Sequence, residues 1–125
     1  MIEGIIREAG TPILTIKIIG KGGEDITTEG ILDTGFDGFL CLPIPIAVSL
    51  GLELIDVTQT ELADGTVVEN ELVFAGQVEW DGNVMDVDIL LTRSEDVLIG
   101  TAFLEGYQVR LDYKANKVFI EKGKT

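Results

Sequence analysis

Short apolar, β-branched segments alternate with polar, glycine-containing turns along most of the chain, a pattern typical of β-strands joined by tight turns. Glycine is abundant, with 15 residues scattered over the 125 positions. The segments predicted to be strands are residues 13–19, 26–32, 54–63, 66–80, 84–91, 107–112 and 117–120. We therefore expect an all-β fold, a closed barrel of short antiparallel strands.

Two Asp-Gly pairs, Asp64-Gly65 and Asp81-Gly82, are the strongest hairpin signals in the chain. A helical pattern is limited to residues 43–50, which start with prolines, and to residues 101–105, which start with Thr101 as a candidate N-cap. Each of these segments is followed by a glycine. No linker or low-complexity tract interrupts the chain, so residues 1–125 are predicted to form a single domain with one or two short helices.

Composition excludes several classes of function. A hydrophobic content of 46% argues against disorder, and 22 acidic against nine basic residues give a net charge of −13, which disfavours binding to nucleic acid or to an anionic membrane surface. The chain has no histidine, which excludes Ser-His and Cys-His mechanisms and His-ligated zinc. Cys41 is alone, and neither a signal-peptide pattern nor an apolar run of membrane-spanning length is present, so we expect a cytoplasmic location.

The most informative motif is Ile31-Leu32-Asp33-Thr34-Gly35, a single acid at the end of an apolar strand. A carboxylate in that position is costly unless the site uses it. The later segment Val97-Leu98-Ile99-Gly100 has the same apolar approach and the same glycine but no acid. One acid and a half-matching repeat predict a site that a second copy of the chain completes.

These motifs resemble those of the retropepsin-like aspartic proteases, the family of the retroviral proteases and their bacterial and archaeal relatives. The resemblance extends from about residue 13 to residue 120. The segments that carry it are Thr15-Ile16-Lys17-Ile18, Leu32-Asp33-Thr34-Gly35-Phe36-Asp37, Leu40-Cys41-Leu42-Pro43 with Ala47 and Leu50-Gly51-Leu52, and Val97-Leu98-Ile99-Gly100-Thr101-Ala102-Phe103-Leu104.

The resemblance implies a homodimeric aspartic endopeptidase in which Asp33 of each subunit contributes one of two catalytic carboxyls. Such a pair shares one proton, because two adjacent carboxyls cannot both ionise easily, and its titration belongs to the pair. The resemblance also implies that Thr34 bonds to the other subunit and that Gly35 lets the backbone pass close to the acids. It implies no metal and no cofactor, and its substrate is an extended peptide or protein.

A hairpin that covers the bound peptide, a flap, is the other part that the resemblance implies. Ala63, Asp64, Gly65 and Thr66 lie where the family places it, between the catalytic loop and the C-terminal glycine. Asp81-Gly82 is the alternative tip, but it lies nearer to the C-terminal strands. The substrate would lie extended under the flap and pair its backbone as an added strand.

The sequence departs from the retroviral pattern in two places. Two arginines that usually hold the acid equivalent to Asp37 are replaced by Thr101 and Thr11, which leaves local backbone groups or another arginine as partners of Asp37. The arginines considered are Arg7, Arg93 and Arg110. Phe36 replaces a small residue, so the substrate pocket expected around Phe36, Ile99 and Gly100 should be narrow or reshaped, while Leu98 and Ile99 are expected in the core under any function.

Other readings remain open at this stage. The fold could serve as a catalytically silent peptide-binding or dimerisation module, or as a structural monomer, in which case Asp33 would be an ordinary turn residue. Asp81, Asp86 and Asp88 form an acidic cluster, but Asp86 and Asp88 alternate with apolar residues as the outward face of a strand does. For a sheet between subunits, residues 117–120 are favoured over residues 1–10.

Overall fold

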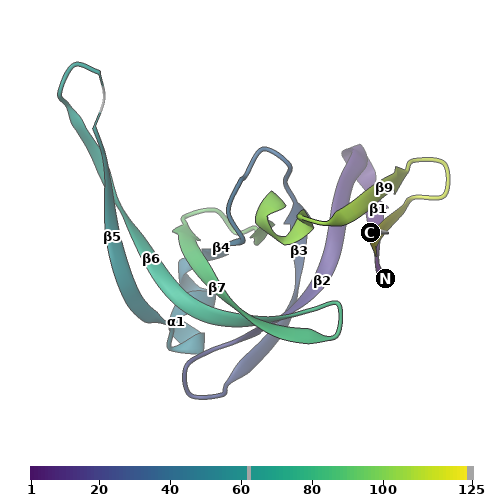
Figure 1. Ribbon diagram of the computed structural model, residues 1–125, viewed down its shortest axis with the longest axis horizontal. Coiled ribbons are helices and arrows are strands. Elements are labelled where there is room, and N and C mark those ends of the chain that lie inside the picture. Colours follow the sequence, from purple (N-terminus) through teal and green to yellow (C-terminus); the bar gives the residue numbers. More distant parts are fainter. Residues whose placement is uncertain (62, 124–125) are drawn as a thin grey trace.

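The computed structural model describes residues 1–61 and 63–123, and for residues 59–61 and 67–70 it describes the backbone alone. Strands dominate it (Figure 1). They are β1 (Ile2–Arg7), β2 (Thr11–Ile19), β3 (Asp25–Leu32), β4 (Leu40–Pro43), β5 (Glu53–Glu61), β6 (Val67–Trp80), β7 (Asn83–Thr92), β8 (Leu98–Ile99), β9 (Tyr107–Asp112) and β10 (Lys117–Lys122). The helices are α1 (Ile44–Leu50) and the 3₁₀ turns η1 (Glu8–Gly10) and η2 (Thr101–Leu104).

All the strands belong to one sheet that closes on itself. The order is β5-β6-β7-β4-β8-β3-β2-β1-β10-β9, and an additional antiparallel pairing joins β6 to β2. Strands β6, β7, β4, β8, β3 and β2 therefore form a ring, from which β5 extends at one end and β1, β10 and β9 at the other. The all-β prediction is confirmed, and the sheet is ring-like rather than a simple antiparallel barrel, because β8 pairs in parallel with β3 and β4 in parallel with β7.

The turns follow from the local sequence. Asp81 and Gly82 both have positive φ, 49° and 82°, which is the twist that a two-residue hairpin turn between β6 and β7 requires. Helix α1 begins after Pro43 and ends at Gly51, whose left-handed conformation (φ 60°) suits a glycine C-cap. Both hairpin signals and this helix were predicted from the sequence.

The core lies inside the ring and under the β1–β10 extension. Its large, fully buried side chains come from strands on all sides and, for Leu50, from α1; those on strands are Leu14, Ile18, Leu40, Leu42, Val78, Ile89, Ile99, Val118 and Ile120. Trp80 stacks on Phe103 of η2 with ring centroids 4.5 Å apart, which fixes η2 to the β6 side of the ring. Burial of this apolar area is the main stabilising contribution to the fold.

The structure differs from the sequence prediction at two segments near the ends. The predicted helix of residues 101–105 is a 3₁₀ turn whose N-cap is Gly100 rather than Thr101. Residues 2–7, for which no strand was predicted, form β1, and β10 pairs with β1 on one side and β9 on the other. None of the described helices combines the length and the apolar composition needed to cross a bilayer.

Candidate active site

Asp33 follows the last residue of β3 and is held in place by its own backbone and by β8. Its N–H donates to the carbonyl oxygen of Ile99 at 2.9 Å, and two residues earlier Ile31 N–H donates to Val97 O at 2.8 Å. The carboxylate oxygen Oδ1 accepts a hydrogen bond from the N–H of Gly35 at 2.9 Å. The side chain is only half-buried, so the second carboxylate oxygen is available to a partner or a substrate.

The loop between β3 and β4 is locked onto the segment that follows β8. Gly100 N–H donates to Phe39 O at 2.8 Å, Thr101 N–H to Phe36 O at 2.9 Å, and Ala102 N–H to Gly38 O at 3.2 Å. These bonds join segments far apart in the sequence, and Figure 1 shows the loop rising beside η2. The conformation around Asp33 is therefore fixed by the β8–η2 segment.

Two glycines allow this close approach. A Cβ on Gly100 would lie 2.0 Å from Gly38 O, which no side chain tolerates. The Phe36 ring fills the space beside both glycines, because a Cβ on Gly38 would lie 2.7 Å from Phe36 Cζ and one on Gly100 would lie 2.8 Å from Phe36 Cδ2. The half-buried Phe36 ring thus covers the point next to Asp33 where the backbones of Gly38 and Gly100 cross.

Thr101 has a role that the sequence did not reveal. Its hydroxyl donates to Phe36 O at 3.3 Å, and its own N–H donates to the same oxygen. A threonine directly after the glycine of a half-matching repeat was the available signal, but the pattern of helix formers after it favoured a helix N-cap. In the structure, Thr101 bonds the loop that carries Asp33 instead.

Thr34, Gly35 and Asp37 are exposed on the same loop. Of the arginines considered as partners of Asp37, Arg7 pairs with Glu29 and Arg110 with Asp112. Among the side chains that the structure describes, which exclude those of residues 59–62, 67–70 and 124–125, none forms an ion pair or hydrogen bond with the Asp37 carboxylate. The Thr34 and Asp37 side chains are therefore exposed on the loop that carries Asp33.

The hairpin of β5 and β6 extends away from the ring, and the tip residues Ala63, Asp64, Gly65 and Thr66 are exposed (Figure 1). The Asp64 carboxylate accepts the N–H of Thr66 at 2.9 Å, and Gly65 has a positive φ of 85°. The alternative tip at Asp81-Gly82 lies beside the N-terminus, since Asp81 pairs with the Met1 amino group at 3.1 Å. Of these two hairpins, β5–β6 is thus the one that projects from the ring, and its role as a flap stays a prediction.

Comparison with known proteins gives a result at the level of the fold. Neither the models of protein families nor the curated proteins contain a match to this sequence. The solved structures do, at probability 1.00: a retropepsin-like aspartic protease from Rickettsia conorii has a TM-score of 0.64 at 16% identity, with 98% of this chain and 89% of that chain covered. This chain has the retropepsin-like fold.

Two viral structures agree with this assignment. The EIAV protease in complex with the inhibitor HBY-793 gives a TM-score of 0.53 at 16% identity, covering 79% of this chain and 89% of that chain. The protease of simian foamy virus (mac) gives a TM-score of 0.51 at 13% identity, covering 73% of this chain and 91% of that chain. In the retropepsin-like fold of this chain, the loop after β3 carries Asp33, and Gly100 packs closely against Gly38 of that loop.

Ile99 lies in the core of this retropepsin-like fold rather than on a surface. Its side chain is fully buried, and it contacts Gly30, where a Cβ would lie 2.8 Å from Ile99 Cδ1. The expectation that Ile99 belongs to the core therefore fits its position, whereas its placement among the substrate-pocket residues does not. The preceding residue, Leu98, is half-buried.

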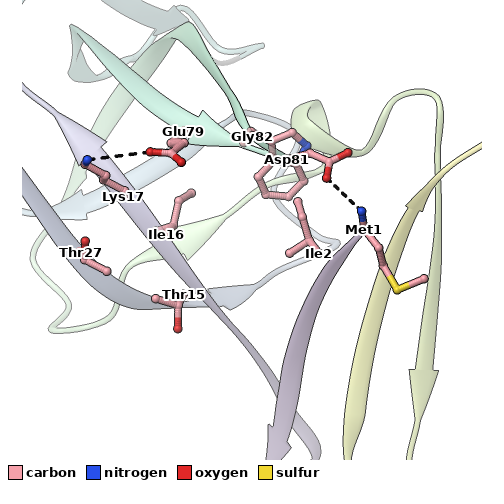
Figure 2. Close-up of a pocket in the computed structure, with 10 residues that line it drawn as sticks. Met1, Ile2, Thr15, Ile16, Lys17, Thr27, Glu79, Asp81 and Gly82 are labelled. Atoms are coloured by element: carbon pink, nitrogen blue, oxygen red, sulfur yellow. Dashed lines mark hydrogen bonds and ion pairs between the residues drawn. The ribbon is translucent and has the colours of Figure 1, made fainter.

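Other chemistry finds little support in the described residues. Burial, followed by the charge of Glu71, raises the pKa of Cys41, so this thiol stays protonated and is a poor nucleophile. No group of three or more acidic or cysteine side chains comes together in the described ranges as a metal site would require. A cavity of about 390 Å³ between β1, β2 and the β6–β7 turn is edged by the Lys17–Glu79 pair at 3.9 Å (Figure 2), and none of residues 33–38 lines it.

The stability of the turn at the tip of the β5–β6 hairpin is expected to depend on pH. Hydrogen bonding by the Thr66 side chain, together with the Thr66 N–H, lowers the pKa of Asp64. Because this pKa is lower in the folded turn than in an unfolded chain, the bonds stabilise the turn above the ordinary titration range of aspartate and are lost as the pH falls through the lowered value. An NMR titration of Asp64 should therefore show a lowered midpoint that rises in Thr66→Ala; the same midpoint in both proteins would contradict this.

Proposed function

We propose that the protein is an aspartic endopeptidase whose catalytic dyad consists of Asp33 from each of two identical chains. The observation that supports this most strongly is the placement of Asp33, half-exposed at the end of a strand, with one carboxylate oxygen held by Gly35 N–H and its backbone held by Ile99. The likeness of the fold to that of a retropepsin-like aspartic protease supports the proposal.

The chemistry follows from two carboxyls that share one proton. One carboxylate removes a proton from a water molecule, and that water attacks the peptide carbonyl carbon. The other carboxyl donates its proton to the carbonyl oxygen, and the resulting tetrahedral intermediate collapses with proton transfer to the leaving amine. Thr34, exposed beside Asp33, would form hydrogen bonds with the same loop of the partner chain. Asp37 would face the substrate or the backbone of its own loop.

The β5–β6 hairpin would complete the site. With its exposed tip at Ala63 to Thr66, it would close over an extended peptide, exclude water and pair with the substrate backbone. No metal or cofactor takes part in this reaction scheme.

A peptide-library digest tests this proposal. Wild-type protein is incubated with the library at pH values from about 3 to 7, the range over which such dyads titrate, with and without a statine inhibitor that mimics the tetrahedral intermediate. Cleavage that the inhibitor blocks is the expected result. Peptides that bind without being cut at any of these pH values would instead indicate a silent binding module.

Phe36 is expected to limit the size of the substrate side chain next to the scissile bond. Its ring occupies the space beside Gly38 and Gly100, adjacent to Asp33. Phe36→Ala should open this space and raise kcat/KM for substrates with larger side chains relative to small ones by about 10-fold or more. The same library, digested by both proteins, measures the shift, and an unchanged preference would place the Phe36 ring outside the substrate pocket.

A further inference from the structure

Strand β2 has two neighbours along one of its edges, and they leave a gap between them. Strand β3 occupies the other edge of β2 from residue 13 to residue 19. On the first edge, β1 pairs with residues 11–13 and β6 with residues 17–19. Within the described part of the chain, residues 14–16 therefore have no partner strand on this edge. The cavity of about 390 Å³ lies at this gap, where Thr15 lines it (Figure 2).

The backbone of Thr15 faces this gap. The N–H of Ile6 in β1 donates to Asn116 O at 3.0 Å, next to β10. Because the backbone groups of successive strand residues face opposite edges, Ile5 faces β2, and its partner Ile13 faces β1. Thr15 follows Ile13 by two residues, so its N–H and carbonyl oxygen face the same edge, toward the cavity. A peptide backbone offers the complementary pair of groups.

Trp80, at the end of β6, adds an unpaired donor to the lining of the same cavity. The residue is only 6% exposed, and its ring Nε1 is buried without a hydrogen-bond acceptor among the residues that the structure describes. The ring is held by Phe103, which stacks on it at 4.5 Å between centroids, and by Tyr107, edge-on at 6.1 Å. The N–H has already lost its water, so an acceptor oxygen that reaches it removes the cost of an unsatisfied buried donor.

The charged groups that line the cavity are paired with one another. The Met1 amino group lies 3.1 Å from Asp81 Oδ1, and Lys17 Nζ lies 3.9 Å from Glu79 Oε2, as the dashed lines of Figure 2 show. Two positive and two negative groups cancel each other. A charged ligand would find no free counter-charge among these four groups, so the cavity favours an uncharged ligand.

We propose that this cavity binds a short, uncharged segment of extended peptide. The backbone of the peptide pairs with Thr15, and one of its carbonyl oxygens accepts the N–H of Trp80. An apolar side chain of the peptide lies against Ile2 and Ile16, which line the cavity (Figure 2). The volume is within the range of ligand sites, about 300 to 1,000 Å³. None of residues 33–38 lines the cavity, so the inference does not depend on the proposed protease activity.

An NMR titration observes this site directly, because Trp80 is the only tryptophan of the chain. Wild-type protein labelled with ¹⁵N is titrated with the capped dipeptide N-acetyl-leucyl-leucinamide. We expect the single indole N–H proton signal to move to lower field, as hydrogen bonding causes, and the Thr15 amide signal to shift with it. The same shifts are expected in Asp33→Asn. An indole signal that exchanges with water but does not respond to the dipeptide, or a response that Asp33→Asn abolishes, would overturn the proposal.

Two matched variants test the hydrogen bond to the indole. Trp80→Phe removes the ring N–H but keeps an aromatic ring to stack on Phe103, and Tyr113→Phe removes a hydroxyl outside the cavity, on a residue that is 58% exposed. We expect Trp80→Phe to raise the dissociation constant of the dipeptide by about 5-fold or more in calorimetric titrations, and Tyr113→Phe to leave it unchanged. Equally tight binding by Trp80→Phe and wild type would contradict the proposal. If Trp80→Phe does not fold, the titration of the wild type decides.

Discussion

Asp33→Asn is expected to abolish peptide cleavage, with kcat/KM falling by about 10³-fold or more. An amide cannot take a proton from water, and in a dimer of identical chains the single substitution removes both carboxyls of the dyad. The fold should be preserved, because the amide oxygen of asparagine can still accept the Gly35 N–H that Asp33 Oδ1 accepts at 2.9 Å. Initial rates on a peptide found by the library digest measure the loss.

The matched control is Asp88→Asn, which makes the same change of charge at an exposed position on β7. It should cut at the wild-type rate, and sedimentation should show the same oligomeric state for all three proteins. Equal cleavage by wild type and Asp33→Asn would exclude the dyad. A loss of activity in Asp33→Asn that accompanies a loss of dimer would point to an effect on assembly rather than on chemistry.

Local sequence rules account for most of the strands and turns. The Asp64-Gly65 and Asp81-Gly82 pairs predicted the hairpins β5–β6 and β6–β7, and the predicted strand of residues 107–112 matches β9 at both ends. These features depend on residues close together in the chain, where turn geometry decides the register. Their prediction needs no knowledge of the rest of the molecule.

Pairings between distant segments were not predictable in the same way. Strand β8 has two residues, Leu98 and Ile99, and exists only because β3 and β4 lie on either side of it. Strand β1 was missed since its alternation is broken by Gly4 and its partners, β2 and β10, lie on both sides of it in the folded sheet. Tertiary contacts, rather than local preference, decide such short strands.

In the candidate site, too, the features set by local motifs were predicted and those set by distant contacts were not. Asp33, Gly35 and Gly100 were recognised from two motifs of the sequence, and the structure brings these motifs together through the bond from Asp33 N–H to Ile99 O. The hydroxyl bond from Thr101 to Phe36 O was not predicted, because it joins residues separated by 65 positions. Side-chain burial was also read too coarsely: Ile99 and Leu98 are neighbours, yet only Ile99 is fully buried.

Gly100→Ala is expected to destabilise the protein by about 3 kcal/mol, the second large effect that the structure predicts. The added Cβ would lie 2.0 Å from Gly38 O and 2.8 Å from Phe36 Cδ2, so the two backbone segments must separate. The backbone itself does not oppose alanine, because Gly100 has a φ of −96°. The cost is therefore steric, and it falls on the crossing that holds the Asp33 loop. Urea unfolding measures the change in the free energy of unfolding.

Substitutions at two further glycines distinguish an effect on stability from an effect on function. Gly22→Ala, where nothing lies within 4 Å of the added Cβ, should change the stability by less than about 0.5 kcal/mol. Gly20→Ala meets Leu50 O at 2.0 Å and should destabilise the fold as Gly100→Ala does, but away from the Asp33 loop. Assayed where all variants remain folded, Gly20→Ala should keep its cleavage rate while Gly100→Ala loses most of it. Equal rates in these two variants would show that the crossing of Gly38 and Gly100 supports the fold without positioning Asp33.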